Sequence, residues 1–200
     1  SAVNTLDGDF TGSVFGDDST LLVDGINNKI VGAVDTASLR TSETKIALGE
    51  NAGLTTQGVY AVAVGNDAGK TTQGTEAVAI GNDAGNTTQG AGAVAVGGAA
   101  GYTGQGNFAV AVGNDAGNTT QGYGATAVGN SSGSNTQGNF AVAIGFNAGT
   151  TSQGISAVAI GDTAGKTNQG EDSIAIGKEA GETNQAANSI ILNATGVAVE

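Results

Sequence analysis

The chain repeats itself every sixteen residues without insertion or deletion, and few folds can accommodate that period. One unit, GVYAVAVGNDAGKTTQ, covers residues 58–73, and the next, GTEAVAIGNDAGNTTQ, covers residues 74–89. Three positions recur through nine consecutive units: a Gly after the apolar pair, a second Gly four residues later, and a closing Gln. Such regularity is typical of a solenoid, in which each unit stacks on its two neighbours.

Each unit predicts two short strands joined by two turns. Segment 62–64 alternates branched residues with Ala, which is the period of a strand. The N-D-A-G cluster that follows forms a turn, because Gly adopts positive φ without steric cost. A second extended piece, Thr-Thr-Gln, ends at residue 73. We therefore predict an all-β fold, a parallel β-roll or solenoid with coils of sixteen residues. The absence of Pro agrees with this fold, since Pro cannot donate to a ladder.

The alternation in the longer strand assigns its residues to two opposite faces. We expect the branched face to form the core of the roll, with these core candidates: Val62, Val64, Val78, Ile80, Val110, Val112, Val142, Ile144, Val158 and Ile160. The other face is a column of Ala, and the candidates for packing against identical chains are Ala63, Ala79, Ala95, Ala111, Ala143 and Ala159. The simpler alternative is an Ala face exposed to solvent.

A thin core is the reason to expect association. Two buried branched side chains contribute roughly 1.5–3 kcal/mol each, whereas fixing the backbone costs about 1–2 kcal/mol per residue over the whole coil. The invariant Gln column supplies a polar contribution, because stacked amides can bond along the rod. Gln73, Gln89, Gln121 and Gln153 are the expected members of this polar ladder.

Composition excludes several classes of function. The chain has no Cys and no His, so it offers no thiolate nucleophile, no imidazole base and no ordinary zinc site. The net charge of -12 would repel nucleic acid. No run of about 18 apolar residues exists, so we expect no membrane insertion. We expect no enzyme activity, no cofactor and no metal site.

Two groups of side chains remain as candidates for contacts at the turns. Asp67, Asp83 and Asp115 recur in the first turn, where a solvated surface is the favoured interpretation and a bound cation the alternative. Among the aromatic residues, those at positions 60, 108 and 140 share one register and are expected to pack in the core or an interface. Weak candidates for receptor contact are Tyr102, Tyr123 and Phe146.

The repeats resemble the head repeats of trimeric autotransporter adhesins of the YadA type. The resemblance lies in strands such as Ala141-Val142-Ala143-Ile144-Gly145 and Ser173-Ile174-Ala175-Ile176-Gly177, and it covers about residues 45–192. It implies a left-handed parallel β-roll assembled as a homotrimer. The period of sixteen departs from the fourteen typical of that family, and the two extra residues fall in the turns.

The flanking segments suggest how the chain is organised. Residues 1–40 lack the period and are expected to form short strands at 13–15, 20–23 and 29–34. The roll occupies 41–192, and 193–200 is expected to lead toward a further C-terminal part. Both flanks resemble segments of phage tail fibres, notably those of cyanophages. The expected function is therefore a structural or adhesive segment of a virion fibre, with other virion proteins and a host receptor as partners. The alternative is an autotransporter adhesin head on a bacterial surface.

Overall fold

The computed structural model describes residues 13–15, 21–24 and 44–194. The chain divides between residues 41 and 42 into two compact units. In the first unit β1 (Ser13–Phe15) pairs antiparallel with β2 (Leu21–Asp24). These elements confirm two of the three strands that we predicted before the repeat. The third, at 29–34, lies outside the described residues.

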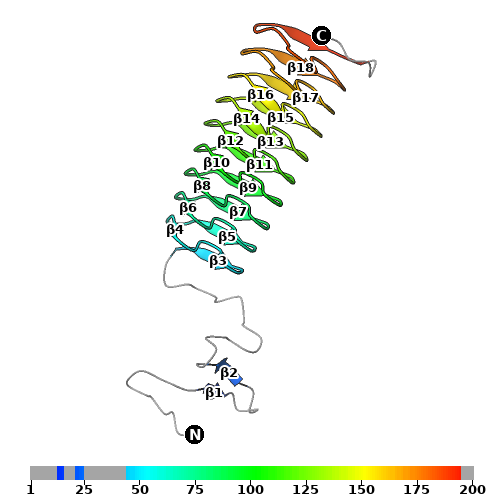
Figure 1. Cartoon of the computed structure of the whole chain (residues 1–200). Coiled ribbons are helices and arrows are strands. Elements are labelled where there is room, and N and C mark those ends of the chain that lie inside the picture. Colours follow the sequence, from blue (N-terminus) through cyan, green and yellow to red (C-terminus); the bar gives the residue numbers. More distant parts are fainter. Residues whose placement is uncertain (1–12, 16–20, 25–43, 195–200) are drawn as a thin grey trace. The chain divides into compact units, whose positions relative to one another are not determined.

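The second unit is a stack of coils, each of which contributes a strand to one sheet, and the coils from β3 (Ile46–Leu48) to β15 (Val142–Ile144) also contribute a strand to a second sheet (Figure 1). The longer strands form a ten-stranded sheet from β3 (Ile46–Leu48), β5 (Val62–Val64), β7 (Val78–Ile80), β9 (Val94–Val96), β11 (Val110–Val112), β13 (Thr126–Val128), β15 (Val142–Ile144), β17 (Val158–Ile160), β18 (Ile174–Ile176) and β19 (Ile190–Leu192). The shorter strands form a seven-stranded sheet from β4 (Thr56–Gln57), β6 (Thr72–Gln73), β8 (Thr88–Gln89), β10 (Gly104–Gln105), β12 (Thr120–Gln121), β14 (Asn135–Gln137) and β16 (Thr151–Gln153).

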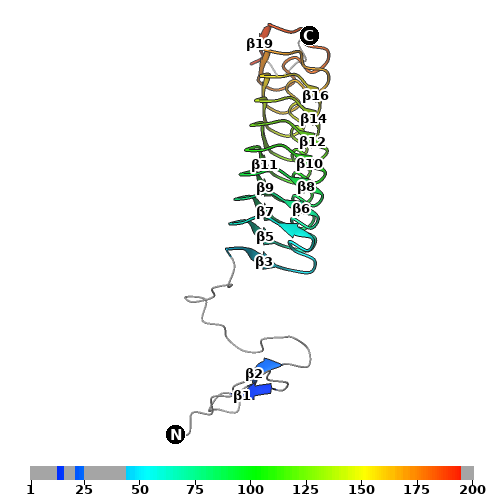
Figure 2. The ribbon, with the colours of Figure 1, turned by 90° about the vertical axis from the view of Figure 1, so that its left-hand side faces the viewer.

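Residues that pair between neighbouring coils are sixteen positions apart, which is the period of the sequence. Val62 pairs with Val78 in a parallel ladder, and Gln73 pairs in the same way with Gln89. Every residue therefore stacks on its counterpart sixteen positions away, and the two sheets face one another across the coil (Figure 2). The predicted fold class is confirmed: the described part of the roll is an all-β parallel solenoid with sixteen-residue coils and no helix.

The turn that follows the longer strand requires glycine at two positions, which are Gly113 and Gly117 in one coil. Gly113 has a φ of 131°, and a Cβ built on it would lie 2.5 Å from the carbonyl oxygen of Gly129 in the next coil. Gly117 has a φ of 54°, and its Cβ would lie 2.8 Å from the amide carbon of Gln121. Any other residue at Gly113 would combine backbone strain with a clash against the backbone of the next coil, and at Gly117 it would clash with the buried side chain of Gln121.

The structure contradicts the assignment of the two strand faces. The Ala side chains that we expected to meet other chains are fully buried inside the coil, as Ala63, Ala79, Ala95, Ala111, Ala143 and Ala159 each show no exposed surface. They belong to the apolar core of their own chain. The branched residues expected in that core instead point outward and are partly or largely exposed: Val62, Val64, Val78, Ile80, Val110, Val112, Val142, Ile144, Val158 and Ile160.

The reason for this reversal is the small space between the two sheets. A Cβ added to Gly117, in the turn that follows β11, would lie 3.3 Å from the Cβ of Ala111 and 2.8 Å from the amide carbon of Gln121, so the Ala methyl group and the Gln side chain already fill the interior of the coil. The Ala column contains a larger residue only at its end, where Ile191 in β19 pairs with Ala175. Ile191 is partly buried. Branched side chains therefore cannot turn inward along the stack.

Exchanging Ala111 for Val should destabilise the roll by about 1–3 kcal/mol, because it adds two methyl groups to a filled core. Val112→Ile is the matched control, since it enlarges an outward position that Ile80 and Ile144 already occupy in other coils. Denaturant unfolding followed by circular dichroism measures both. A larger loss of stability in the control than in Ala111→Val would contradict the assignment of the two faces.

Candidate interaction surfaces

The outward face of the ten-stranded sheet is an apolar surface that continues along the whole stack of coils. Its first column contains Ile46, Val62, Val78, Val94, Val110, Thr126, Val142, Val158, Ile174 and Ile190. Its second column contains Leu48, Val64, Ile80, Val96, Val112, Val128, Ile144, Ile160, Ile176 and Leu192. Thr126 is the one member that carries a polar group. Ile80, Ile144 and Ile176 are exposed by 41%, 39% and 40%, so the surface is open in the single chain. We call it the branched face.

A surface of this kind normally contacts a partner. Soluble monomers seldom expose large continuous apolar patches, and a sheet with one open apolar face is stabilised when a second layer covers it. Neither column contains a charged residue. Because the Ala side chains are enclosed in their own chain, the branched face replaces the Ala column as the candidate for self-association.

The Gln column lies inside the roll and crosses its core. Gln73 is 1% exposed, and its Nε2 donates to the carbonyl oxygen of Val62 at 2.8 Å on the facing sheet. The Nε2 of Gln121 likewise donates to the carbonyl oxygen of Val110 at 2.7 Å. The same connection recurs at Gln89 and Gln153. Each Gln therefore holds the two sheets together within a coil.

The predicted amide ladder is present only toward the C-terminal end. Gln153 Nε2 donates to Gln169 Oε1 at 3.1 Å, and Gln169 Nε2 donates to Gln185 Oε1 at 3.1 Å. The ladder prediction is wrong for Gln73, Gln89 and Gln121, whose Nε2 atoms bond to backbone carbonyls. Their buried Oε1 atoms have no partner, as is also the case for Gln153. Gln153 and Gln169 make the cross-core bond as well as the ladder bond, so the cross-core bond is the feature common to the whole column.

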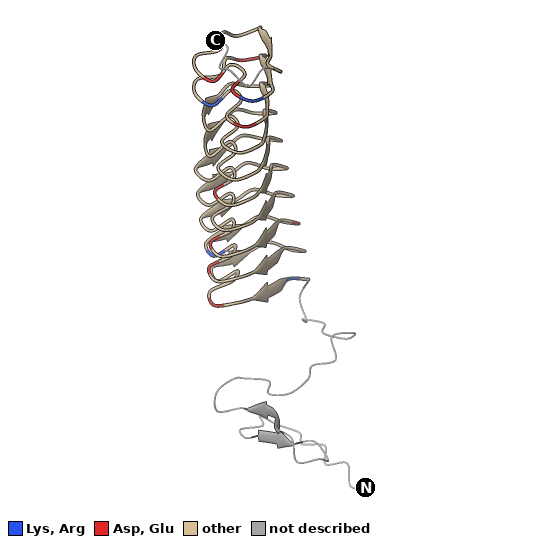
Figure 3. Ribbon diagram, turned by 90° about the vertical axis from the view of Figure 1, so that its right-hand side faces the viewer, with Lys and Arg blue, Asp and Glu red and all other residues tan. Residues whose placement is uncertain are grey.

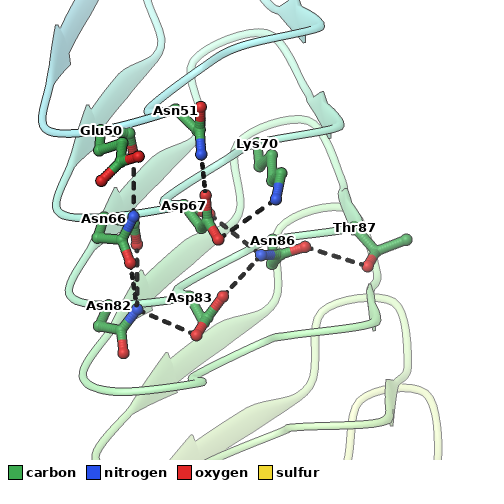
Figure 4. Close-up of polar contacts among 9 residues, drawn as sticks. All are labelled: Glu50, Asn51, Asn66, Asp67, Lys70, Asn82, Asp83, Asn86 and Thr87. Carbon is green, nitrogen blue, oxygen red and sulfur yellow. Dashed lines mark hydrogen bonds and ion pairs between the residues drawn. The ribbon is translucent and has the colours of Figure 1, made fainter.

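The turn after the longer strand carries a side-chain ladder that we did not predict (Figure 4). Asn82 Nδ2 donates to both the backbone oxygen and the Oδ1 of Asn66, each at 3.3 Å. Asn130 contacts Asn114 in the same way, at 3.3 and 3.1 Å. The signal in the sequence is an Asn after the Gly in these coils. The stacking of side-chain amides that we expected for the Gln column therefore also occurs between Asn side chains at the surface of the roll.

The turn carboxylates are held by neighbouring side chains (Figure 4). Asp67 accepts a 2.8 Å hydrogen bond from Asn51 Nδ2, and its other oxygen lies 3.3 Å from Lys70 Nζ. Asp83 accepts from Asn82 Nδ2 at 3.0 Å and from Asn86 Nδ2 at 2.8 Å. The bond from Asn51 is the main cause that lowers the pKa of Asp67; desolvation opposes it, and Lys70 contributes in the same direction as Asn51.

Metal-binding and membrane-spanning features are absent from the described ranges 13–15, 21–24 and 44–194. No group of three or more carboxylates gathers there in a way that could hold a metal ion. No helix in those ranges has the length and apolar character needed to cross a membrane.

The aromatic residues lie at the surface. Tyr60, Phe108 and Phe140 are 61%, 58% and 57% exposed in the single chain, so the expectation that they pack in the core is wrong, and their packing in an interface stays a prediction. The weak candidates for receptor contact, Tyr102, Tyr123 and Phe146, are exposed as expected. Tyr102 and Phe146 lie in or beside the turn that follows the longer strand, whereas Tyr123 lies in the other turn, so these three do not form one site. Whether they contact a receptor stays a prediction.

These features define the class of the protein: a parallel β-solenoid whose coils leave one apolar sheet face open. A family model for the YadA head domain repeat matches residues 121–148 in two copies. The coils of this chain thus fit YadA-type head repeats, and the same sixteen-residue pattern continues on both sides of the matched segment. The match indicates an adhesin-like structural segment with an extracellular or surface-exposed location. The searches of curated proteins and of solved structures give no match.

Removing the hydrogen bond from Asn51 should raise the pKa of Asp67 toward its ordinary value. A carboxyl whose pKa is lowered on folding adds stability above its unfolded pKa of about 3.9. That stability is lost as the pH falls through the lower, folded pKa. Asn51→Gly keeps the turn, because Gly tolerates the φ of 55° at this position.

An NMR titration of the Asp67 carboxyl carbon measures this shift. Asn147→Gly is the control, because Asn147 occupies the same turn position six coils further along the chain, with a φ of 52°. It should leave the titration of Asp67 unchanged. An identical titration of Asp67 in the wild-type chain and in Asn51→Gly would refute the role given to Asn51.

Proposed function

We propose that this protein is a structural, adhesive segment of a homotrimeric fibre and that three copies associate through their branched faces. The observation that carries the proposal is that both outward columns contain only Val, Ile and Leu over the ten longer strands, with Thr126 as the single exception. Covering this face removes from water the apolar area that a single narrow coil leaves exposed, which is the main favourable contribution to association. The likeness to YadA-type heads supports three as the number of copies.

The residue types in the two columns support the branched face as the surface that is buried between chains. In a trimer of parallel rods, residues that lie sixteen positions apart would have equivalent neighbours in every coil. The two columns of the branched face contain only Val, Ile, Leu and one Thr. The turn positions, in contrast, accept charges in some coils, including Glu50 and Asp67 in one turn and Glu76 in the other. The sheet face is thus suited to burial and the turns to water.

Within this class we propose a virion fibre, specifically a phage tail fibre, that projects or presents a surface for a host receptor. The non-repetitive segment 1–40 and the residues after Asn188 support it, since both resemble parts of such fibres. Its partners would be identical chains, other virion proteins and the receptor. The alternative, the head of a bacterial trimeric autotransporter adhesin, fits the repeats equally well. A coiled-coil stalk and β-barrel anchor in the same gene product would favour it.

We propose no catalytic role and no bound cofactor. The chain lacks His and Cys. Its recurrent carboxylates at Asp67 and Asp83 bond to Asn side chains in exposed turns. A fibre segment works by its length, its rigidity and the surface that it displays.

Multi-angle light scattering of the purified chain at micromolar concentration tests the assembly. We expect the mass of three chains, against 19.1 kDa for one. A stable, folded monomer would overturn the proposal.

Val128→Glu should prevent assembly, because it places a carboxylate in the branched face, where burial of an unpaired charge is costly. Asn130→Glu is the matched control two residues further on, at a turn position where other coils carry Glu50 and Asp162. Light scattering should give a smaller mass for Val128→Glu and a trimer for Asn130→Glu. Equal masses for the two variants would place the interface elsewhere.

A further inference from the structure

An aromatic cluster spans three consecutive coils on the turn that precedes the longer strand. The ring centroids of Phe108 and Tyr123 lie 5.7 Å apart, and those of Tyr123 and Phe140 lie 5.4 Å apart. Both pairs are edge-to-face, with interplanar angles of 79° and 73°. This geometry is favourable for aromatic pairs and fixes the rings relative to one another. All three side chains are exposed, Tyr123 by 45%.

The backbone carries strain at two of these positions. Phe108 and Phe140 have φ values of 58° and 59°, a left-handed conformation that costs roughly 1–2 kcal/mol for a residue with a side chain. Other coils place Gly92 and Gly124 at the same position, where this conformation is free of that cost. Tyr60, Glu76, Ser156, Asp172 and Asn188 occupy this position in further coils and have the same left-handed conformation, with φ values of 52° to 62°. The conformation therefore belongs to the turn itself, which accepts exposed side chains as well as Gly at this position.

The neighbouring coils leave room for the rings. A Cβ on Gly92 would lie 2.8 Å from Phe108 Cδ1, and one on Gly124 would lie 3.2 Å from Phe140 Cδ1. Each Phe ring therefore lies over a Gly of the preceding coil. Aromatic residues and glycines alternate along the stack, and this alternation is what allows Tyr123 to stand between the two Phe rings.

Two amides accompany the cluster and keep donors free. Asn107 Oδ1 accepts a hydrogen bond from the backbone N of Ala91 at 3.0 Å, and Asn139 Oδ1 accepts from the backbone N of Tyr123 at 2.9 Å. These bonds fix both side chains. The Nδ2 groups make no hydrogen bond to any residue in the described part of the chain, and both side chains are exposed. Each Phe therefore follows an oriented amide that can donate to a ligand.

The cluster lies in a part of the roll that is almost free of charge. Residues 84–161 contain one charged residue, Asp115, and no Lys or Arg (Figure 3). Recognition by ion pairs is therefore unavailable to most of this surface. A neutral ligand suits it, with apolar C–H groups for the rings and hydroxyls for the amides.

The cluster is distinct from the proposed trimer interface. Its two turn positions carry Glu76, Glu171 and Asp172 in other coils, and these positions are therefore suited to solvent in a trimer of parallel rods. A second copy of the chain would meet equivalent positions in every coil, whereas the aromatic cluster occurs in three. The cluster is therefore confined to three coils of an otherwise repetitive rod.

We infer that Phe108, Tyr123 and Phe140, with the amides of Asn107 and Asn139, form a binding site for a neutral carbohydrate. The apolar face of a sugar ring packs against the negative face of an aromatic ring, and the Asn Nδ2 groups donate to its hydroxyls. This site rests on the proposed function and deepens it, because it names the residues and the ligand chemistry by which this segment itself would contact a receptor.

The test measures binding of neutral oligosaccharides to the whole chain by calorimetry and saturation-transfer NMR. The panel contains oligomers of glucose, galactose, mannose and N-acetylglucosamine. The variant combines Phe108→Gly, Tyr123→Thr and Phe140→Gly, and each change copies a residue found at the same position of another coil: Gly92, Thr75 and Gly124. The fold should therefore persist, which circular dichroism checks.

The control combines Tyr102→Asn and Phe146→Asn, which copy Asn118 and Asn130 and remove two exposed aromatic residues outside the cluster. We expect at least one oligosaccharide to bind the wild-type chain and the control equally, and its affinity to fall at least tenfold in the triple variant.

Exchanging both Asn107 and Asn139 for Asp should also weaken binding, since the change keeps an acceptor and removes the donors. Absence of binding by every panel member at millimolar concentration would overturn the inference, as would equal binding by the triple variant. Light scattering on the same samples reports assembly separately, so a failure of the trimer proposal is distinguishable from a failure of this one.

Discussion

The narrow gap between the two sheets determines the rest of this structure. Only a methyl group and a Gln side chain fit between the facing strands, as Ala111 and Gln121 do in one coil. Close packing of this kind leaves no volume for a larger side chain without strain. The Gln amide donates across the gap to the carbonyl of Val110, so the same residue fills space and joins the sheets. The repeated Gly residues allow the tight turns that such a small coil needs.

The branched residues are outside as a consequence of this gap. A core of Ala and Gln removes little apolar area from water, and the Val and Ile side chains that could contribute more are displaced to the surface. The chain therefore presents its most hydrophobic side chains on one sheet face. Association through that face would provide the core that a single coil lacks. The turn positions that face solvent carry the Asn ladder, the carboxylates and the aromatic cluster.

Periodicity predicted the strands, the turns and the register, because stacking requires each residue to meet its counterpart sixteen positions away. It could not decide which face is inside, since alternation shows only which residues share a face. The sequence does contain a difference that separates the two faces. The inward column is Ala in all but its last coil, whereas the outward columns vary among Val, Ile, Leu and Thr. The contact between Tyr123 and Phe140 was beyond prediction, because it depends on how rings from different turn positions lean across coils.

The accessibility of a thiol on the branched face shows whether identical chains cover this face in the native protein. The chain has no Cys, so Ile144→Cys and Thr120→Cys each introduce one reporter. Ile144 is 39% exposed in the single chain, and Thr120 lies exposed on the other sheet. We expect the thiol at position 144 to be protected from a maleimide in the native assembly and the thiol at position 120 to react rapidly. Equally rapid reaction at both positions in the folded protein would show that identical chains do not cover this face.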